Sequence, residues 1–135
     1  MIDIVVFDTS VLIDHLRTDR HVLRMANLEA LVRYSSVVLA ELWRGVDSPN
    51  DHQVLRNIEK NHPILTPTEK NWLESGLILA RMRADKGFES AKLRDLHFDV
   101  LIALTARSHG AKLITSNRND FELIREYRDF NLEVW

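Results

Sequence analysis

The chain has 135 residues and a net charge of −2, with 45% hydrophobic and 28% charged residues, which is the composition of an ordinary folded protein. This length predicts one domain spanning residues 1–135. The chain contains no cysteine, which excludes disulfides and thiolate metal sites and disfavours zinc, and its slightly acidic balance argues against tight, nonspecific nucleic-acid binding.

Targeting and membrane segments are also absent from the sequence pattern. No apolar run reaches the roughly 18 residues that a membrane span requires. The chain enters a predicted strand almost at once, without the basic region and cleavage site of a signal peptide. We therefore expect no membrane contact and take the cytoplasm as the default location.

The first half of the chain predicts alternating strands and helices. Ile2 to Phe7 is rich in β-branched residues and predicts a short buried strand, and Thr9 or Ser10 can cap the helix that follows it. Further along, the pattern predicts helices at 20–32, 40–45 and 51–61 and a second strand at 34–39, with a break at 48–50.

The second half continues the alternation. Thr68 is expected to cap a long helix that ends near Gly87, and its apolar stripe and Gly76 suggest close helix packing. The stripe consists of Trp72, Leu73, Leu77, Ala80 and Ala84. The other predicted elements are an extended segment at 63–67, helices at 96–108 and 120–127, and strands at 112–115 and 132–135. Gly110 is expected to end the helix at 96–108.

This order of elements predicts the fold class. Strands that alternate with helices form a mainly parallel sheet covered by helices on both faces, which is a three-layer α/β/α sandwich. In such sheets the functional site lies beyond the carboxyl ends of the strands.

Four acidic residues fall at the ends of predicted elements. Asp8 and Asp120 follow predicted strands, Glu41 follows the apolar run 37–40, and Asp99 lies at the start of an apolar helix. If the four carboxylates meet at one edge of the sheet, they form a pocket too negative to exist comfortably without a divalent cation. Oxygen ligands select Mg²⁺ or Mn²⁺, a chemistry suited to attack on a phosphodiester.

Each acid also has an ordinary structural explanation. Asp8 and Asp120 can be helix caps, and Glu41 suits the first turn of a helix. Asp99 is harder to explain in this way, because its apolar neighbours would bury a lone carboxylate at a high cost. Asp95 shares its helix face and is either an additional acid or, as we favour, a solvated side chain.

Four segments together resemble the PIN domain family, in particular the single-domain VapC toxins of toxin–antitoxin systems. They are Val5 to Ile13, Val38 to Gly45, Asp99 to Ala106 and Thr115 to Phe121. No single segment is specific, but their order, approximate spacing and the total length all agree with the family.

The resemblance implies a Mg²⁺-dependent endoribonuclease, with Mn²⁺ as a substitute, that cleaves tRNA or rRNA and inhibits translation. It further implies a homodimer and a cognate VapB-type antitoxin, through which alone the toxin would contact operator DNA. Asp8, Glu41, Asp99 and Asp120 carry over as the acidic quartet. The supporting polar residues that carry over are Ser10, Thr115 and Asn117.

In this interpretation a metal-activated water attacks the scissile phosphate, and Arg17, Arg44 and Arg118 are possible contacts to the RNA backbone. Apolar side chains of the first helices either contact a partner or, as we favour, belong to the core. They are Leu12, Leu16, Leu42 and Trp43.

Two other functions are weighed against this one. A phosphatase of the haloacid dehalogenase type would use Asp8 as nucleophile, but it needs a second aspartate where this chain has Ser10. A catalytically inactive PIN-fold binding module is the main alternative, and the presence of all four acids argues against it.

Overall fold

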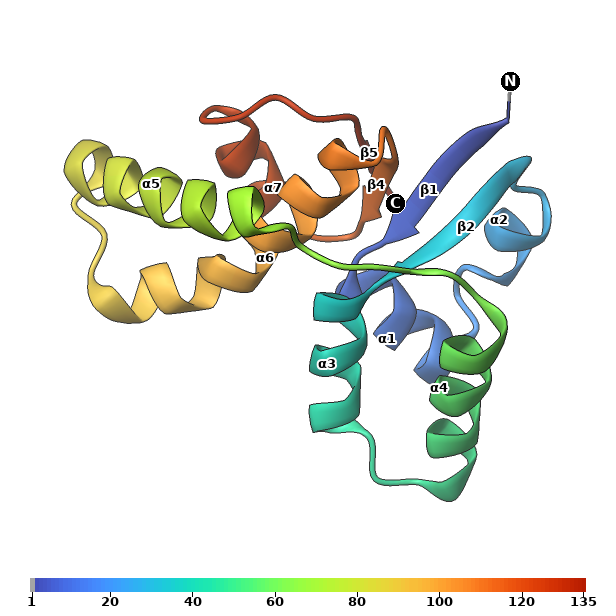
Figure 1. Cartoon of the computed structure of the whole chain (residues 1–135). Coiled ribbons are helices and arrows are strands. Elements are labelled where there is room, and N and C mark those ends of the chain that lie inside the picture. The colour runs from blue at the N-terminus through green and yellow to red at the C-terminus, as the bar shows by residue number, and fades with distance from the viewer. Residues whose placement is uncertain (1) are drawn as a thin grey trace.

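A computed structural model describes residues 2–135 (Figure 1). Its centre is a five-stranded sheet with the order β3-β2-β1-β4-β5, in which every neighbouring pair is parallel. The strands are β1 (Asp3–Phe7), β2 (Ala30–Ser35), β3 (Ile64–Leu65), β4 (Lys112–Thr115) and β5 (Leu132–Val134).

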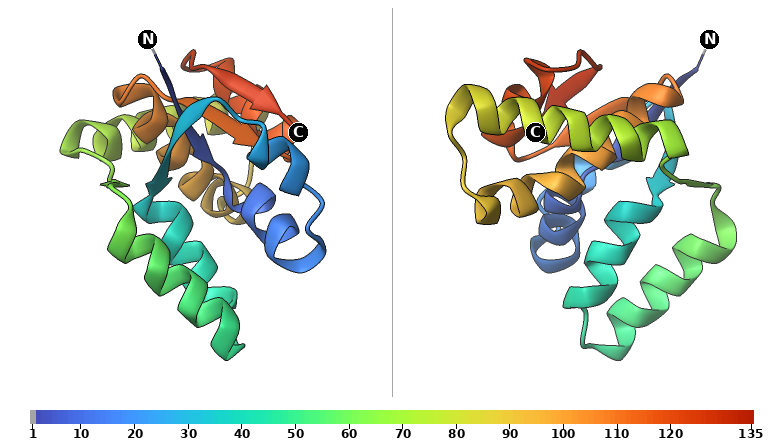
Figure 2. Two further views of the ribbon diagram at one scale, coloured as in Figure 1. Left: turned by 90° about the vertical axis from the view of Figure 1, so that its right-hand side faces the viewer. Right: turned by 60° about the vertical axis from the view of Figure 1, so that its left-hand side comes forward.

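Helices cover the sheet on both sides, as the sequence predicts for a three-layer α/β fold (Figures 1 and 2). They are α1 (Thr9–Thr18), α2 (Val22–Ala26), α3 (Ser36–Gly45), α4 (Pro49–Asn61), α5 (Glu69–Lys86), α6 (Ser90–Ser108) and α7 (Arg118–Arg125). Helices α5 and α6 pack together on one side, whereas α3 and α4 project as a pair beyond the carboxyl ends of β1 and β2 (Figure 1). None of the helices within residues 2–135 is long and apolar enough to cross a bilayer.

The core is centred on β1, β4 and the second half of α6. Val5, Val6 and Phe7 are consecutive and all buried, as expected for a central parallel strand with helices on both faces. On α6 the whole segment from Val100 to Ala106 is buried, so this helix is apolar all round where it crosses the sheet. Each fully buried aliphatic side chain of this kind contributes about 1.5–3 kcal/mol.

The predicted helix at 20–32 and strand at 34–39 are wrong. Helix α2 ends at Ala26, β2 occupies Ala30–Ser35, and the apolar run 37–40 lies in α3 instead of in a strand. The Ser35 side chain caps α3 by accepting hydrogen bonds from the backbone N–H groups of Val37 and Val38, at 3.1 and 3.4 Å. A short buried apolar run does not distinguish strand from helix by its periodicity, and here the cap decides.

Two other helices begin earlier than predicted. Helix α6 begins at Ser90 instead of Leu96, so Asp99 lies in its middle and not at its start. Helix α7 begins at Arg118, because the Asn117 side chain accepts a hydrogen bond from the backbone N–H of Asp120 at 3.4 Å and caps the helix. The predicted cap at Thr68 is confirmed, as is the end of α5 at Gly87, which has a φ of +69°.

The apolar stripe predicted for α5 faces solvent. Trp72, Leu73 and Leu77 are 49%, 66% and 67% exposed, and a Cβ at Gly76 would meet no atom within 4 Å. The inner face of α5 carries two polar residues instead, since Asn71 donates to the Ser108 hydroxyl at 3.0 Å and Ser75 pairs with His97 at 3.1 Å. These bonds to α6, together with Ile78, Leu79 and Met82, rotate the apolar stripe away from the core.

Candidate active site

Asp8 lies at the carboxyl end of β1 and occupies the N-cap position of α1, but its side chain does not cap the helix. Its Oδ2 atom instead accepts hydrogen bonds from the Ser10 hydroxyl at 2.8 Å and the Thr115 hydroxyl at 2.9 Å. Asp8 is only 3% exposed, and its backbone N–H bonds to the Ile114 carbonyl of β4. The carboxylate is therefore fixed by β4 and by its own helix, as a positioned ligand would be.

A chain of hydroxyl groups extends from Asp8 into the loop after β4. Ser10 accepts a hydrogen bond from the backbone N–H of Ser116 at 3.1 Å, and Thr115 accepts one from the backbone N–H of Asn117 at 2.9 Å. Each hydroxyl thus donates to Asp8 and accepts from the loop. This network joins the ends of β1 and β4 and includes all three supporting residues that the resemblance implies.

Asp120 is held on both of its oxygens. Asn117 donates to Oδ2 at 3.0 Å, and the Lys92 ammonium lies 3.4 Å from Oδ1. The first-turn position of Asp120 in α7 adds a favourable interaction with the helix dipole. Asp120 is not the helix cap that its alternative explanation requires, because Asn117 caps α7.

Glu41 reaches the site from within α3 and not from the end of a strand. Thr9 donates to its Oε1 at 2.8 Å. Burial raises the pKa of Glu41, and the charge of Asp8 adds to this, whereas the Thr9 hydrogen bond and Arg44 lower it. The influence of Asp8 on this pKa places the two carboxylates in one electrostatic environment.

Asp99 interacts electrostatically with each of the other three acids. Its pKa is raised to about 8, first by burial and then by the charges of Asp8, Glu41 and Asp120, while Lys92 acts in the opposite direction. The hydrogen bonds formed within residues 2–135 include none to its carboxylate. The four predicted acids are therefore neighbours in space, and we name them the acidic quartet.

The other residues singled out from the sequence lie near the acidic quartet, on the surface or in the core. Arg44 lies 5.9 Å from the Phe98 ring and is close enough to Glu41 to lower its pKa. Asp95 is exposed, and Arg118 is exposed at the start of α7. Of the apolar candidates, Leu12 and Leu42 are buried in the core, while Leu16 and Trp43 are half-buried.

The sequence interpretation misses two residues of this site. Thr9 orients Glu41, and Lys92 pairs with Asp120. Lys92 escapes notice because the predicted helix begins only at Leu96. Once α6 begins at Ser90, Lys92 and Asp99 are two turns apart on one face of the helix, which is the pattern that identifies it.

The chemistry of these residues fits a hard divalent cation. Carboxylate oxygens are the preferred ligands of Mg²⁺, and a cation would offset both the burial of Asp99 and the charges of its three acidic neighbours, which together raise its pKa. Within residues 2–135 no three acidic or histidine side chains already converge as metal ligands. Glu41 bonds to Thr9 and Asp120 bonds to Asn117, and we expect both carboxylates to turn toward Asp99 when a cation binds.

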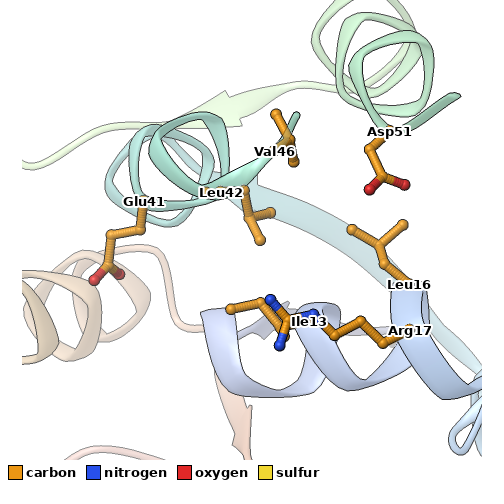
Figure 3. A pocket seen from close by; sticks show the side chains of 8 residues that line it. Ile13, Leu16, Arg17, Glu41, Leu42, Val46 and Asp51 are labelled. Atoms are coloured by element: carbon orange, nitrogen blue, oxygen red, sulfur yellow. The ribbon is translucent and has the colours of Figure 1, made fainter. Parts of the chain in front are cut away.

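A small apolar pocket lies beside the acidic quartet, between α1, α3 and α4 (Figure 3). Ile13 and Leu16 line it from α1, and Leu42 and Val46 line it from the region of α3. Glu41 lies at one end of the pocket, as Figure 3 shows, and Arg17 and Asp51 add polar groups. An apolar surface therefore continues directly into the acidic site.

The sequence profile of the PIN domain family matches residues 5–127, so the chain belongs to the PIN domain family, a family of nucleases. Among curated protein sequences, none matches this chain.

Solved structures share the fold at low sequence identity. The chain matches a DNA-bound VapBC from Salmonella typhimurium with a TM-score of 0.72 and 24% identity, over 100% of this chain and 99% of that one. A DNA-bound VapBC2 from Rickettsia felis gives a TM-score of 0.70 at 22% identity, over 98% of both chains. VapBC-1 from nontypeable Haemophilus influenzae gives 0.69 at 22% identity, also over 98% of both chains. These likenesses agree with the PIN fold.

Metal-free protein should lose stability as the pH rises. The pKa of Asp99 is about 8 in the folded chain and 3.8 for an ordinary aspartate, so between these values the folded state binds more protons than the unfolded state. The contribution of Asp99 to stability is therefore fully present below about pH 4 and is lost as the pH rises toward 8. A tenfold change in proton affinity corresponds to about 1.4 kcal/mol, and solvent screens part of the repulsion, so we expect the decrease to be a few kcal/mol at most.

Urea unfolding in EDTA across this pH range measures the effect. Asp99→Asn should flatten the pH dependence, and Asp95→Asn, one turn earlier and exposed, is the matched control that should keep it. Equal slopes for wild type and Asp99→Asn would contradict the assignment of the raised pKa to Asp99.

Proposed function

We propose that this PIN domain is a Mg²⁺-dependent endoribonuclease that acts as the toxin of a VapBC pair and cleaves tRNA or rRNA. The observation that carries the proposal is the acidic quartet, in which burial raises the pKa of Asp99 and the charges of Asp8, Glu41 and Asp120 raise it further. The PIN family membership and the VapBC complexes among the similar folds support it. Mn²⁺ is expected to substitute for Mg²⁺.

In this proposal Asp8, Glu41, Asp99 and Asp120 hold the cation. When bound, the cation supplies Lewis-acid activation of water and stabilises the charge that develops on the phosphate. Ser10 and Thr115 fix Asp8 through its Oδ2 atom, which leaves Oδ1 for the cation. Asn117 positions Asp120, and Thr9 positions Glu41, so that the hydroxyl and amide groups orient the carboxylates instead of touching the reacting atoms.

The products expected from water attack on the phosphodiester are a 5′-phosphate and a 3′-hydroxyl. Arg44 is the best placed of the three arginines to contact the RNA backbone, since it lies beside Glu41 and Phe98. Arg17 lines the adjacent pocket, and Arg118 is exposed on α7 beyond Asp120. The three would extend a basic track to either side of the acidic quartet.

RNA cleavage tests the proposal directly. Wild-type chain incubated with total RNA should cleave it in Mg²⁺ or Mn²⁺ and not in EDTA. Asp8→Asn and Asp99→Asn should lower the rate at least about 100-fold while circular dichroism stays native, because each removes a charge that the cation requires. Asp95→Asn serves as the control and should cleave like wild type.

Full activity of Asp99→Asn, or cleavage that persists in EDTA, would overturn the nuclease mechanism. A wild-type chain that binds neither metal nor RNA would favour the alternative of a protein-binding module.

We infer that the antitoxin uses the acidic quartet and the apolar pocket beside it as one surface. A segment that binds here needs apolar side chains that contact Leu16 and Val46 and a basic side chain that pairs with Glu41. An amphipathic, basic peptide meets both requirements. Such a segment would exclude RNA and cation at once. The relatives named VapBC are complexes of toxin and antitoxin, which supports a VapB-type partner for this chain. Contact with operator DNA would then be made by the antitoxin.

A substitution in the pocket should weaken this complex. Leu16→Glu places a charge in the apolar pocket and should raise the Kd for a synthetic amphipathic, basic peptide from the cognate antitoxin by roughly 10-fold or more. Isothermal titration calorimetry measures it, and Leu23→Glu on the exposed surface of α2 is the control. An unchanged Kd for Leu16→Glu would place the antitoxin elsewhere.

We infer that a second copy of the chain covers the exposed stripe of α5. The large side chains Trp72, Leu73 and Leu77 occupy its first half, whereas its second half carries the small residues Ala80 and Ala84. Two copies packed antiparallel would therefore match large residues to small ones, as an isologous interface requires.

Loss of the apolar stripe should dissociate this homodimer. Leu77→Asp buries a charge at the centre of the interface and should weaken dimerisation roughly 10- to 100-fold, which light scattering on a size-exclusion column detects as a monomer. Leu23→Asp, at 77% exposure on α2, should leave the dimer intact. A dimer that survives Leu77→Asp would exclude α5 as its interface.

A further inference from the structure

Lys92 lies at the outer edge of the acidic quartet and is not among the residues that would hold the cation. Its ammonium group is 3.4 Å from Oδ1 of Asp120 and lowers the pKa of Asp99. Within residues 2–135 it is the one basic side chain at ion-pair distance from any of the four acids. The charge of the quartet is thus partly neutralised by a group that belongs to the protein itself.

The position of Lys92 is set by α6 and by the aromatic residue that precedes the helix. Lys92 and Asp99 are two helical turns apart on one face, and the ammonium group reaches Asp120 from there. It also lies 6.0 Å from the centre of the Phe88 ring. The Lys92 side chain is 43% exposed, and its flexible stem allows the ammonium group to change partners.

The contact competes with a cation for the same carboxylate. Asn117 bonds to one oxygen of Asp120 and Lys92 lies at the other, and an ammonium group at ion-pair distance repels a divalent cation that takes Asp120 as a ligand, so cation binding favours release of Lys92. The Lys92 side chain is partly exposed, so an ammonium group that leaves Asp120 can reach a phosphodiester bound from the solvent side.

We propose that Lys92 is a substrate-contacting residue that exchanges partners: it pairs with Asp120 in the free protein and with a non-bridging phosphate oxygen of RNA in the loaded enzyme. This assignment rests on the proposed function. It adds Lys92, beside Asp120, to the arginines proposed to contact the RNA backbone, of which Arg44 lies near Glu41.

If Lys92 exchanges partners in this way, removing it should change the affinity for the cation and the affinity for RNA in opposite directions. Without Lys92, a cation meets no competitor at Asp120, so its affinity rises. RNA loses one phosphate contact, so its affinity falls and depends less on salt. A merely structural role for Lys92 would weaken both.

The test compares Lys92→Gln with Lys86→Gln. Lys86 is a matched control, because its side chain is 42% exposed and pairs with Glu126 at 3.7 Å, away from the quartet. For Lys92→Gln we expect the Mn²⁺ Kd in calorimetry without RNA to fall about two- to fivefold, the range of a surface ion pair. We expect KM for RNA to rise about fivefold with kcat nearly unchanged, and the slope of log KM against log salt to decrease by about 0.7. Lys92→Arg should restore both KM and slope.

An Mn²⁺ affinity that is unchanged or weaker in Lys92→Gln overturns the competition at Asp120. A KM and salt slope equal to those of Lys86→Gln overturn the contact with RNA. If the wild type cleaves no RNA, the proposed function fails on that ground and the RNA contact fails with it, while the calorimetry still decides whether Lys92 competes with the cation.

Discussion

The repulsion among four carboxylates around one half-buried position is the constraint on which the rest of this site depends. Asp99 stands in the middle of α6 without a hydrogen bond from residues 2–135, and the charges of Asp8, Glu41 and Asp120 add to the burial that raises its pKa. A folded chain tolerates such a group when it keeps its proton, or when hydrogen bonds fix the neighbours and a positive charge is close. Hydroxyl groups fix Asp8 and Glu41, and Lys92 provides the charge beside Asp120.

The parallel sheet explains why these groups meet. β1 and β4 are adjacent and end at the same edge, so Asp8 and Thr115 are within hydrogen-bond distance although 107 positions separate them in the chain. Helix α6 is buried all round as it crosses the sheet, which gives Asp99 a rigid support. The core thus determines where the charges lie, and the loops contribute only their polar caps.

The sequence predicts those features of the site that depend on residues close together in the chain. Asp8 is placed correctly because an apolar β-branched run before a hydroxyl pair defines both a strand and the start of a helix. Glu41 lies close enough to Asp8 to share its electrostatic environment, but the strand predicted before it is wrong, since that run is helical and the Ser35 side chain caps the helix. The apolar stripe of α5 is wrongly predicted to pack against the core, because Asn71 and Ser75 form hydrogen bonds with α6 instead. These contacts between distant segments cannot be read from the sequence. Lys92 is missed for a related reason, because the polar first half of α6 gives no apolar periodicity from which to extend the helix.

The most direct test of a cation site at the acidic quartet is the anomalous diffraction of a crystal of this chain grown with Mn²⁺. We expect a peak surrounded by carboxylate oxygens of Asp8 and Asp99, with Glu41 and Asp120 turned toward it and Lys92 no longer paired with Asp120. A crystal that contains Mn²⁺ only at other surface positions, with Lys92 still bound to Asp120, would contradict a cation site at the quartet.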